Sequence, residues 1–187
     1  MPDFPSNIGF SKVDPLSHSP AYINEPNSLK TIAVATGTQR WEFELTTKFL
    51  KALEFRQGWA FLNARGGQAF TFDVRLPEFS KPLGAISGAV KSLGAYAIGT
   101  KNIALSNFTP AVGDFIRFAG HRKVYQVESA TGNNATIYPP LFEAVNLNEV
   151  VIADDVPFTV RLTSKVSKLK LDTKKITKLK FKCIEAF

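Results

Sequence analysis

Hydrophobic and polar residues alternate with a period of two in two early segments of the chain. In residues 40–46, Trp41, Phe43 and Leu45 alternate with charged or polar residues, and residues 70–76 show the same pattern. This period is typical of a half-buried antiparallel strand. Residues 31–35 are also rich in strand-forming side chains. The turn at Gly37-Thr38 predicts that they form a hairpin with residues 40–46.

Between these strands the spacing of apolar residues changes. Residues 48–65 follow a 3.6-residue period that Gly58 interrupts, and Gly66-Gly67 ends it, so we predict a helix there. Residues 1–28 contain five prolines. Because proline is excluded from helix interiors and from central strands, we expect an extended arm with at most short edge pairings. Such an arm has little core of its own and is expected to lie against a neighbouring subunit.

The second half of the chain predicts a small barrel. Residues 84–96 are rich in glycine and small side chains, so we expect a connector there. Short strand-like segments separated by glycine-rich turns follow, at residues 98–105, 114–118, 124–128, 135–138 and 158–162. Their number and spacing are typical of a closed or nearly closed barrel of the OB type.

The C-terminal residues return to long alternating strands. Residues 165–171 and 178–184 predict a hairpin that has one apolar face, with Leu179, Phe181 and Cys183, and one lysine-rich face. We expect this hairpin to complete the first sheet, which makes the barrel an insertion. The predicted fold class is therefore mainly β, with one short helix.

Charge is distributed very unevenly. The formal net charge is +7, but nine of the 23 basic residues and two of the 16 acidic ones lie in residues 161–187, which leaves 14 of each in residues 1–160. The lysine face of the terminal hairpin holds the candidate contact residues Lys168, Lys170, Lys178, Lys180 and Lys182. Three interpretations stay open: a solvated sheet edge that resists strand pairing, a contact with an acidic neighbouring protein, and a contact with DNA phosphates.

The predicted barrel does not share this basic character. Residues 98–162 hold four basic residues before Arg161 and six acidic ones. Single-strand-binding OB folds combine a basic groove with exposed aromatic side chains. We therefore interpret the barrel's aromatic residues, Phe115, Phe118, Tyr125 and Tyr138, mainly as core.

Residues able to perform catalysis are sparse and scattered. The two histidines are His18, in the proline-rich segment, and His121, in a predicted turn. Motifs of zinc proteases, serine hydrolases and phosphate-binding loops are absent from the sequence. The Asp154-Asp155 pair is interpreted as part of a turn, and Glu42 and Glu44 as the solvent face of a strand or as a subunit contact. We predict no catalytic residue, cofactor or metal, and thus a protein that is not an enzyme.

Cysteine content and hydropathy limit the cellular setting. The single cysteine, Cys183, excludes an internal disulfide and lies on the apolar strand face, where a buried thiol is expected. This fits synthesis in a reducing cytoplasm. No run approaches the ~20 apolar residues of a membrane span, and the first residues lack the pattern of a secretion signal, so membrane insertion is not expected.

Several local patterns together resemble one family of viral proteins. A Gly113-Asp114 turn leads into a strand, and a strand that contains Lys123-Val124-Tyr125 comes next. The segment Ile-Tyr-Pro-Pro-Leu at Ile137–Leu141 then ends a further strand. Further matching segments lie earlier, at Gly9-Phe10 after the proline-rich start, at residues 60–65 and at residues 72–77. In this order they resemble the short, two-domain distal tail proteins of siphophages, and the resemblance spans most of the chain.

The resemblance implies an architecture and a set of partners. Residues 1–84 and 165–187 would form a β-sandwich-like, ring-forming domain, and residues 85–164 an inserted OB-like barrel. The ring would be a homohexamer in the tail tip of the virion that joins the tail tube protein to the tip hub, baseplate proteins or fibres. Viral DNA would pass through its lumen without specific binding. The basic terminal hairpin does not match the family pattern.

Two other functions remain as alternatives from the sequence. The first is a nucleic-acid-binding OB module that uses the basic terminal hairpin. The second is a carbohydrate- or receptor-binding module that uses the barrel.

Overall fold

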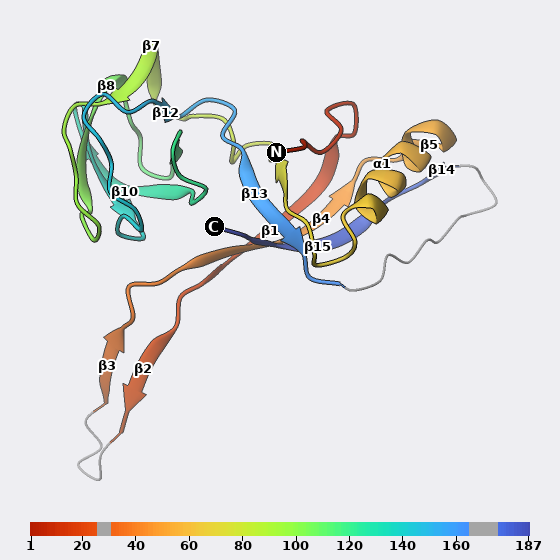
Figure 1. Cartoon of the computed structure of the whole chain (residues 1–187), viewed down its shortest axis with the longest axis horizontal. Helices are drawn as coiled ribbons and strands as arrows, with labels where there is room; N and C mark the ends of the chain where they lie inside the picture. The colour runs from red at the N-terminus through yellow and green to blue at the C-terminus, as the bar shows by residue number, and fades with distance from the viewer. Residues whose placement is uncertain (26–30, 165–175) are drawn as a thin grey trace.

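The computed structural model in Figure 1 describes residues 1–25, 31–164 and 176–187. Most of the regular structure is β, and this part of the chain contains a single helix, α1 (Ala52–Ala64), as the sequence predicts. The strands form a five-stranded antiparallel sheet, a nearly closed six-stranded sheet and two small two-stranded sheets. The predicted fold class, mainly β with one helix, is confirmed.

The five-stranded sheet combines strands from both ends of the chain. In spatial order its strands are β1 (Phe10–His18), β4 (Arg40–Thr47), β15 (Lys180–Glu185), β13 (Phe158–Leu162) and β6 (Phe72–Val74). The six-stranded sheet has the order β12 (Val151–Ile152), β9 (Phe115–Phe118), β10 (Tyr125–Thr131), β11 (Asn134–Tyr138), β8 (Asn102–Thr109) and β7 (Ala85–Ser92). Its strands form one uninterrupted stretch of sequence between β6 and β13.

Alternation along β4 and β15 sets the two faces of the first sheet. The register pairs Phe43 with Cys183 on the buried face and Glu44 with Lys182 on the opposite face. Phe43, Leu45 and Cys183 are buried, and Lys182 is exposed. The alternation read from the sequence is therefore confirmed at these positions.

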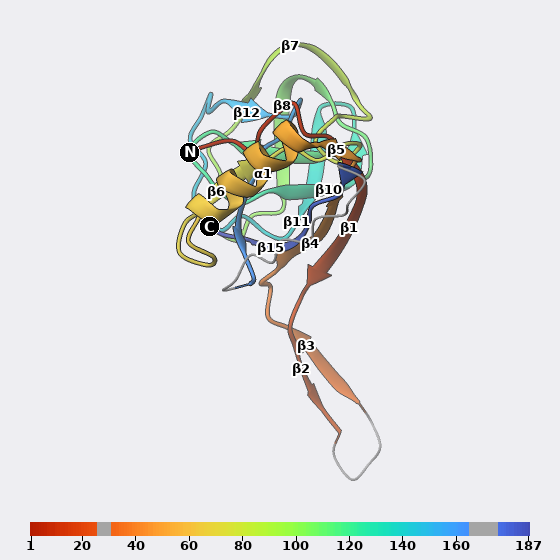
Figure 2. The same ribbon diagram turned by 90° about the vertical axis from the view of Figure 1, so that its right-hand side faces the viewer.

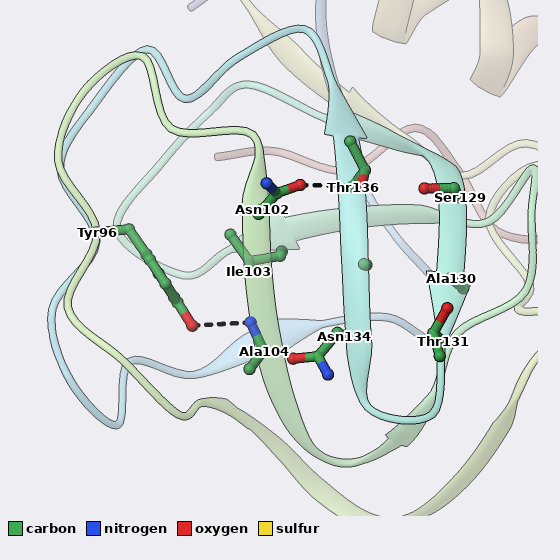
Figure 3. Close-up of a pocket in the computed structure, with 10 residues that line it drawn as sticks. Tyr96, Asn102, Ile103, Ala104, Ser129, Ala130, Thr131, Asn134 and Thr136 are labelled. Carbon is green, nitrogen blue, oxygen red and sulfur yellow. Dashed lines mark hydrogen bonds between the residues drawn. The ribbon is translucent and has the colours of Figure 1, made fainter.

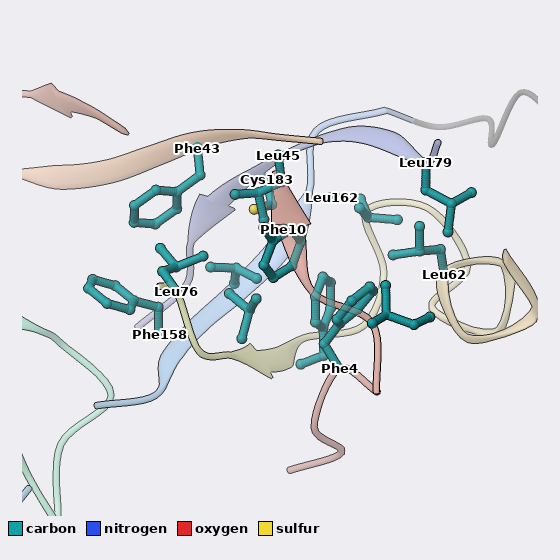
Figure 4. Close-up of a cluster of buried hydrophobic side chains, with 14 of the residues drawn as sticks. Phe4, Phe10, Phe43, Leu45, Leu62, Leu76, Phe158, Leu162, Leu179 and Cys183 are labelled. Carbon is teal, nitrogen blue, oxygen red and sulfur yellow. The ribbon is translucent and has the colours of Figure 1, made fainter. Parts of the chain in front are cut away.

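A phenylalanine-rich core fills the buried face of this sheet (Figure 4). Phe43 and Phe158 meet edge to face with ring centroids 5.2 Å apart. Phe4, which comes from the chain start, packs 5.4 Å from Phe10 and 5.6 Å from Phe181. Aromatic pairs in these geometries add about 0.5–1.5 kcal/mol each beyond the burial of their area.

Helix α1 closes one end of this core. It begins after the short strand β5 (Leu50–Lys51), which pairs with β14 (Ile176–Thr177), and the Glu54 carboxylate accepts the Lys51 N–H at 2.9 Å. Gly58 does not interrupt the helix, which is continuous from Ala52 to Ala64. A Cβ atom at Gly58 would lie 2.7 Å from side-chain atoms of both Ile8 and Leu179. The glycine therefore allows close packing of the helix.

The six-stranded sheet curves into a barrel-like shape with its own core. Its two outer strands approach each other, because Lys91 of β7 forms a bridge with Val150 beside β12. The Ser92 N–H donates to the Glu149 carbonyl at 2.9 Å at the same seam. Of the aromatic residues predicted as core, Phe115, Phe118 and Tyr125 are buried and Tyr138 is half-buried.

The predicted hairpin between residues 31–35 and 40–46 is wrong. Strand β3 (Ile32–Ala35) pairs with β2 (Ala21–Asn24), whereas β4 pairs with β1. These two pairings succeed each other along one long hairpin. Gly37, with φ +73°, lies between β3 and β4, so its turn signal marks the change of direction where the ribbon leaves the sheet.

The N-terminal prediction is also corrected. Phe4, Ile8 and Phe10 belong to the core, and the Phe4 N–H donates to the Asp73 carbonyl at 2.8 Å. Pro15 lies within β1, which is an edge strand, where the missing N–H is tolerated. The segment is extended as expected, but most of it is part of the body of the protein.

Two further expectations fail in the second half. The connector expected at residues 84–96 contains strand β7, and its small, mostly exposed residues give no hydrophobic alternation to detect. Residues 158–162 do form a strand, but β13 lies between β15 and β6 in the five-stranded sheet and not in the barrel. Buried Phe158, Val160 and Leu162 contribute to the first core.

Strands β2 and β3 form a ribbon that projects from the body, and we call these two strands the arm (Figures 1 and 2). Every residue of both strands is exposed. At the base of the arm, the Tyr138 hydroxyl donates to Ser19 Oγ at 2.6 Å. This hydrogen bond joins the barrel to the base of the ribbon.

Candidate functional site

The lysine residues predicted as a contact face are only partly described. Lys168 and Lys170 lie outside the described residues. Lys180 and Lys182 lie on the outer face of β15, which is flanked by β4 and β13. The hypothesis that these lysines protect a sheet edge is therefore wrong for β15, because it is a central strand.

The surroundings of these lysines carry both signs of charge. Lys182 forms an ion pair with Glu44 at 2.8 Å, and this carboxylate raises the pKa of Lys182. The Lys178 ammonium lies 4.4 Å from the centre of the Phe49 ring. The neighbouring strand β4 places Glu42 beside Ile184 on the same face. The described part of this face is thus mixed in charge and unlike a uniform phosphate-binding surface.

A buried polar cluster lies where the two large sheets meet. Lys123, from the loop between β9 and β10, and Glu185, at the end of β15, form an ion pair whose side chains are both 0% exposed. The Lys123 ammonium also donates to Gln39 Oε1 at 2.6 Å. Burial lowers the pKa of Lys123 and raises the pKa of Glu185. We call this ion pair and its partners the junction.

Backbone groups from both sheets complete the junction. Glu185 accepts the Val124 N–H at 2.9 Å and the Trp41 N–H at 3.2 Å. The Trp41 indole N–H in turn donates to the Val124 carbonyl at 3.2 Å. The Phe187 ring centre lies 4.9 Å from the Lys123 ammonium. With these partners, the carboxylate and the ammonium are compensated in a site that excludes water.

A second polar tie lies nearby. The Arg117 guanidinium of β9 donates to the Pro157 carbonyl at 2.9 Å and to Thr159 Oγ1 at 3.1 Å. Thr159 donates to Asp73 Oδ1 at 2.5 Å, and Arg117 lies 3.6 Å from the same carboxylate. Strands β6 and β13 are thereby bonded to the barrel.

The crossing from the first sheet into the barrel is held by Asp114. Its carboxylate accepts the N–H groups of Leu83 at 2.6 Å, Ala111 at 2.7 Å and Gly84 at 3.2 Å. A Cβ atom at Gly84 would lie 2.3 Å from the Thr109 carbonyl oxygen. Glycine is therefore required by space at this point.

The remaining candidates for chemistry have structural partners. His121 is buried, with Nε2 3.3 Å from the Ala144 carbonyl and Nδ1 3.4 Å from the Tyr125 hydroxyl. His18 is exposed at the end of β1. Asp154 and Asp155 lie in a bend and form ion pairs with Lys81. Across the described residues no group of three His, Cys, Asp or Glu side chains could hold a metal ion.

Cys183 is also a structural residue. Its side chain is buried in the first core. Burial raises the pKa of its thiol far above the ordinary range. A thiol that stays protonated is a poor nucleophile, which agrees with the interpretation of Cys183 as a small apolar side chain.

A shallow groove of about 240 Å³ lies on the barrel (Figure 3), and we call it the barrel groove. Small polar side chains line it, and the Thr136 hydroxyl donates to Asn102 Oδ1 at 3.0 Å. The Tyr96 hydroxyl accepts the Ala104 N–H at 2.7 Å, so this ring is fixed at one side of the groove. Ser129 and Asn134 also line the groove and are exposed.

A larger groove of about 590 Å³ lies beside the chain start, and we call it the N-terminal groove. Its lining includes the apolar residues Phe4, Ile8, Phe10, Leu76 and Pro77 and the charged residues Asp3, Arg75, Lys81 and Asp155. The charged residues form ion pairs with one another, since Arg75 binds Asp3 at 3.1 Å and Asp155 at 2.7 Å. Phe4, Ile8, Phe10 and Leu76 are buried in the first core, so the exposed lining of the groove is mainly its self-paired charged rim.

The large side chains of the arm are exposed to solvent. Tyr22, Ile23, Ile32 and Val34 are 76%, 66%, 50% and 57% exposed. The register pairs Tyr22 with Val34 and Asn24 with Ile32, which places the bulkiest side chains on one face. The other face carries Ile23 and alanines. Neither strand contains an Asp, Glu, Lys or Arg residue.

Sequence reasoning missed both the junction and the arm. Lys123 is named from the sequence only as part of the family resemblance and Glu185 is not named, although Glu185 shares its strand parity with Leu179, Phe181 and Cys183. That parity was an available signal, because a charged residue on an apolar face needs a buried partner. The sequence predicts an extended segment over residues 1–28 and does not predict the ribbon that β2 forms with β3.

Comparisons with known proteins add no family assignment, since no protein-family model and no curated protein matches this chain. Among the described residues, no helix is both long enough and apolar enough to span a membrane.

Proposed function

We propose that this chain is a structural protein that works by self-assembly, as a ring-forming component of a bacteriophage tail tip. The observation that carries the proposal is the exposed apolar arm. A lone two-stranded ribbon is marginally stable in water, and contiguous exposed apolar surface is typical of interaction sites. Burying side chains such as Tyr22, Ile23, Ile32 and Val34 stabilises by about 1.5–3 kcal/mol each.

The junction supports the same proposal from another direction. An adaptor in a large assembly must hold its parts in fixed relative positions. Lys123 and Arg117 connect the barrel to the first sheet, and Asp114 holds the crossing at Leu83, through buried or partly buried charge-assisted hydrogen bonds, which are stronger than neutral ones. These polar groups are used for internal connection and not to form an open reactive site.

The assignment to a phage tail tip comes from the resemblance to siphophage distal tail proteins. Of the residues that carry it, Lys123 lies in the contact between the two sheets and Asp114 holds the crossing into the barrel. Under this proposal the ring joins the tail tube to hub, baseplate or fibre proteins, and DNA passes through the lumen without specific binding.

Light scattering after gel filtration, together with negative-stain imaging, tests the proposal. A ring with a central hole, lost on replacing Tyr22 and Val34 with serine, is the expected result. The matched control replaces Ser129 and Thr131, exposed polar residues of the barrel, with alanine and should leave the ring intact. A chain that stays monomeric at all concentrations would contradict the proposal.

The barrel groove supports a second candidate function, glycan binding. Amide and hydroxyl side chains beside a fixed tyrosine ring suit a neutral, polyhydroxylated ligand. Glycan-array binding that is lost in Asn102→Ala and Asn134→Ala variants would support this candidate.

The nucleic-acid alternative requires a test other than truncation. Removing residues 165–187 would delete β15 from the centre of the first sheet. Replacing Lys180 and Lys182 with glutamine leaves this strand in place. Salt-dependent DNA binding that falls in this variant would favour the alternative.

A further inference from the structure

The backbone of the arm has hydrogen-bonding groups along both of its outer edges. At the base of the arm, the Thr36 N–H donates to the Pro20 carbonyl at 3.3 Å. Bonded positions in an antiparallel pair recur at every second residue, so the backbone groups of Tyr22 and Val34 point into the ribbon. The residues between them point their N–H and C=O groups outward, and these are Ala21 and Ile23 of β2 and Ala33 and Ala35 of β3.

Strand β1, which precedes the arm, is protected against pairing with another strand. It is an outer strand of the five-stranded sheet, and its register shifts between Phe10 and Lys12. It also contains Pro15 and the ion pair of Lys12 with Asp14. Bulges, prolines and charges are features by which proteins protect a sheet edge. The arm strands have a regular register and contain no proline and no charged residue, so their edges lack these protections.

The two edges of the arm match each other when the arms of two copies lie side by side. Under rotational symmetry both ribbons point the same way, so β3 of one copy runs antiparallel to β2 of the next. The outward backbone groups of Ala33 then meet those of Ile23, and the bulky face continues from copy to copy. In the register of the ribbon itself, Val34 lies beside Tyr22 of the next copy. The same two side chains are already cross-strand partners within one copy.

We propose that the outer edge of β3 in one copy pairs with the outer edge of β2 in a second copy of this chain. This inference rests on the proposed self-assembly and names the backbone edges that carry it. Each added copy uses one edge and offers the other, so the contact is head-to-tail and repeats until the ring closes. A closed sheet has no edge left. Because the arm projects from the body, neighbouring ribbons can lie alongside each other (Figures 1 and 2).

Proline substitutions at outward-pointing positions test the pairing. The Ala33→Pro variant blocks the edge of β3, and the Ile23→Pro variant blocks the edge of β2. Neither change removes a hydrogen bond within the ribbon, because both N–H groups point away from it, and proline is tolerated on such edges. Each variant alone should be monomeric in light scattering after gel filtration. A 1:1 mixture should give a heterodimer and nothing larger, because it contains one open edge of each kind.

The matched controls keep the backbone donors. Ala33→Ser and Ile23→Val retain the N–H groups at the same positions and should still form rings. Rings in either proline variant overturn the edge pairing but leave self-assembly standing. Dimers of one proline variant alone would show that like edges pair, which also overturns it. A mixture that stays monomeric, although both variants unfold in urea at the same midpoint as the natural sequence, overturns it as well.

Amide hydrogen exchange tests the pairing without any substitution. The amides of Ala21, Ile23, Ala33 and Ala35 should exchange at least about tenfold more slowly in the ring than in the dilute monomer. Unchanged exchange at these four amides in an assembled ring overturns the edge pairing and leaves self-assembly standing. A natural sequence that stays monomeric at all concentrations overturns both proposals.

Discussion

The junction and the arm are built on opposite principles. The junction removes an ammonium and a carboxylate from water and compensates them with hydrogen bonds from both sheets. The arm leaves four large apolar side chains at least 50% exposed to water. The first arrangement costs desolvation and fixes the geometry of one copy. The second is unfavourable in an isolated copy and would become favourable under the proposed assembly. Under the assembly proposal, stability and assembly are carried by different residues.

The largest expected effect comes from breaking the buried ion pair. The Lys123→Met variant should lower the free energy of unfolding by about 3–5 kcal/mol, because Glu185 stays buried without its partner. The double variant Lys123→Met/Glu185→Leu should recover much of this loss. Urea unfolding followed by the fluorescence of Trp41 and Trp59 measures both changes.

The exposed ion pair supplies the control for this experiment. The Lys182→Met variant breaks the ion pair with Glu44, in which the Lys182 side chain is 65% exposed and the Glu44 side chain 47% exposed. Exposed pairs contribute about 0–1 kcal/mol, so a small loss is expected. Equal losses in the Lys123 and Lys182 variants would show that the junction is accessible to water.

Ionisation of Tyr125, which lies beside the junction, should have a smaller effect on the free energy of unfolding. Burial raises the pKa of this phenol to about 12, above its ordinary value of 10.0. Because the folded-state value is the higher one, this stabilising contribution is complete below about pH 10 and is lost as the pH rises through about 12.

The Tyr125→Phe variant removes this dependence. Relative to the variant, the natural sequence should lose about 2–3 kcal/mol between pH 9 and pH 12. Urea unfolding of both proteins across this pH range measures the difference. A constant difference would show that the hydroxyl ionises as freely in the folded protein as in the unfolded one.

At the crossing held by Asp114, we expect a substitution to cause a loss of stability of similar or smaller size. The Gly84→Ala variant should lose about 1–3 kcal/mol, because its Cβ atom would meet backbone atoms of residues 109 and 111. The matched control is Gly88→Ala in β7, where the nearest atom lies 3.5 Å away. Thermal unfolding should change little in this control, and similar shifts in both variants would contradict the packing argument.

The sequence predicts faces of strands better than their partners. Alternation in β4 and β15 correctly assigns Phe43, Leu45 and Cys183 to the core, since a period of two is a local property. The partner of residues 31–35 was assigned from the Gly37-Thr38 turn, but pairing follows the long ladder between β1 and β4. Which strand a segment pairs with depends on contacts distant in sequence, and a turn signal cannot supply them.

The difference between local patterns and contacts distant in sequence also explains why the sequence does not predict the buried ion pair of the junction. Lys123 and Glu185 are 62 residues apart and meet only when the barrel packs against the first sheet. Each charge alone is typical of a solvent-exposed residue. The helix at residues 48–65 was predicted because its apolar period is local, although the role of Gly58 in packing depends on Ile8 and Leu179 from other segments.

The smallest expected effect on stability belongs to the arm. The Tyr22→Ser/Val34→Ser variant should leave the unfolding free energy of the dilute monomer within about 0.5 kcal/mol, because these side chains are already in water. The Leu45→Ala control lies in β4, on the same long hairpin, and is fully buried, so it should lose about 2–5 kcal/mol. Urea unfolding at low protein concentration separates these effects from assembly. A loss above about 2 kcal/mol in the arm variant would mean that the arm packs against its own body, which would remove the apolar surface on which the assembly proposal depends.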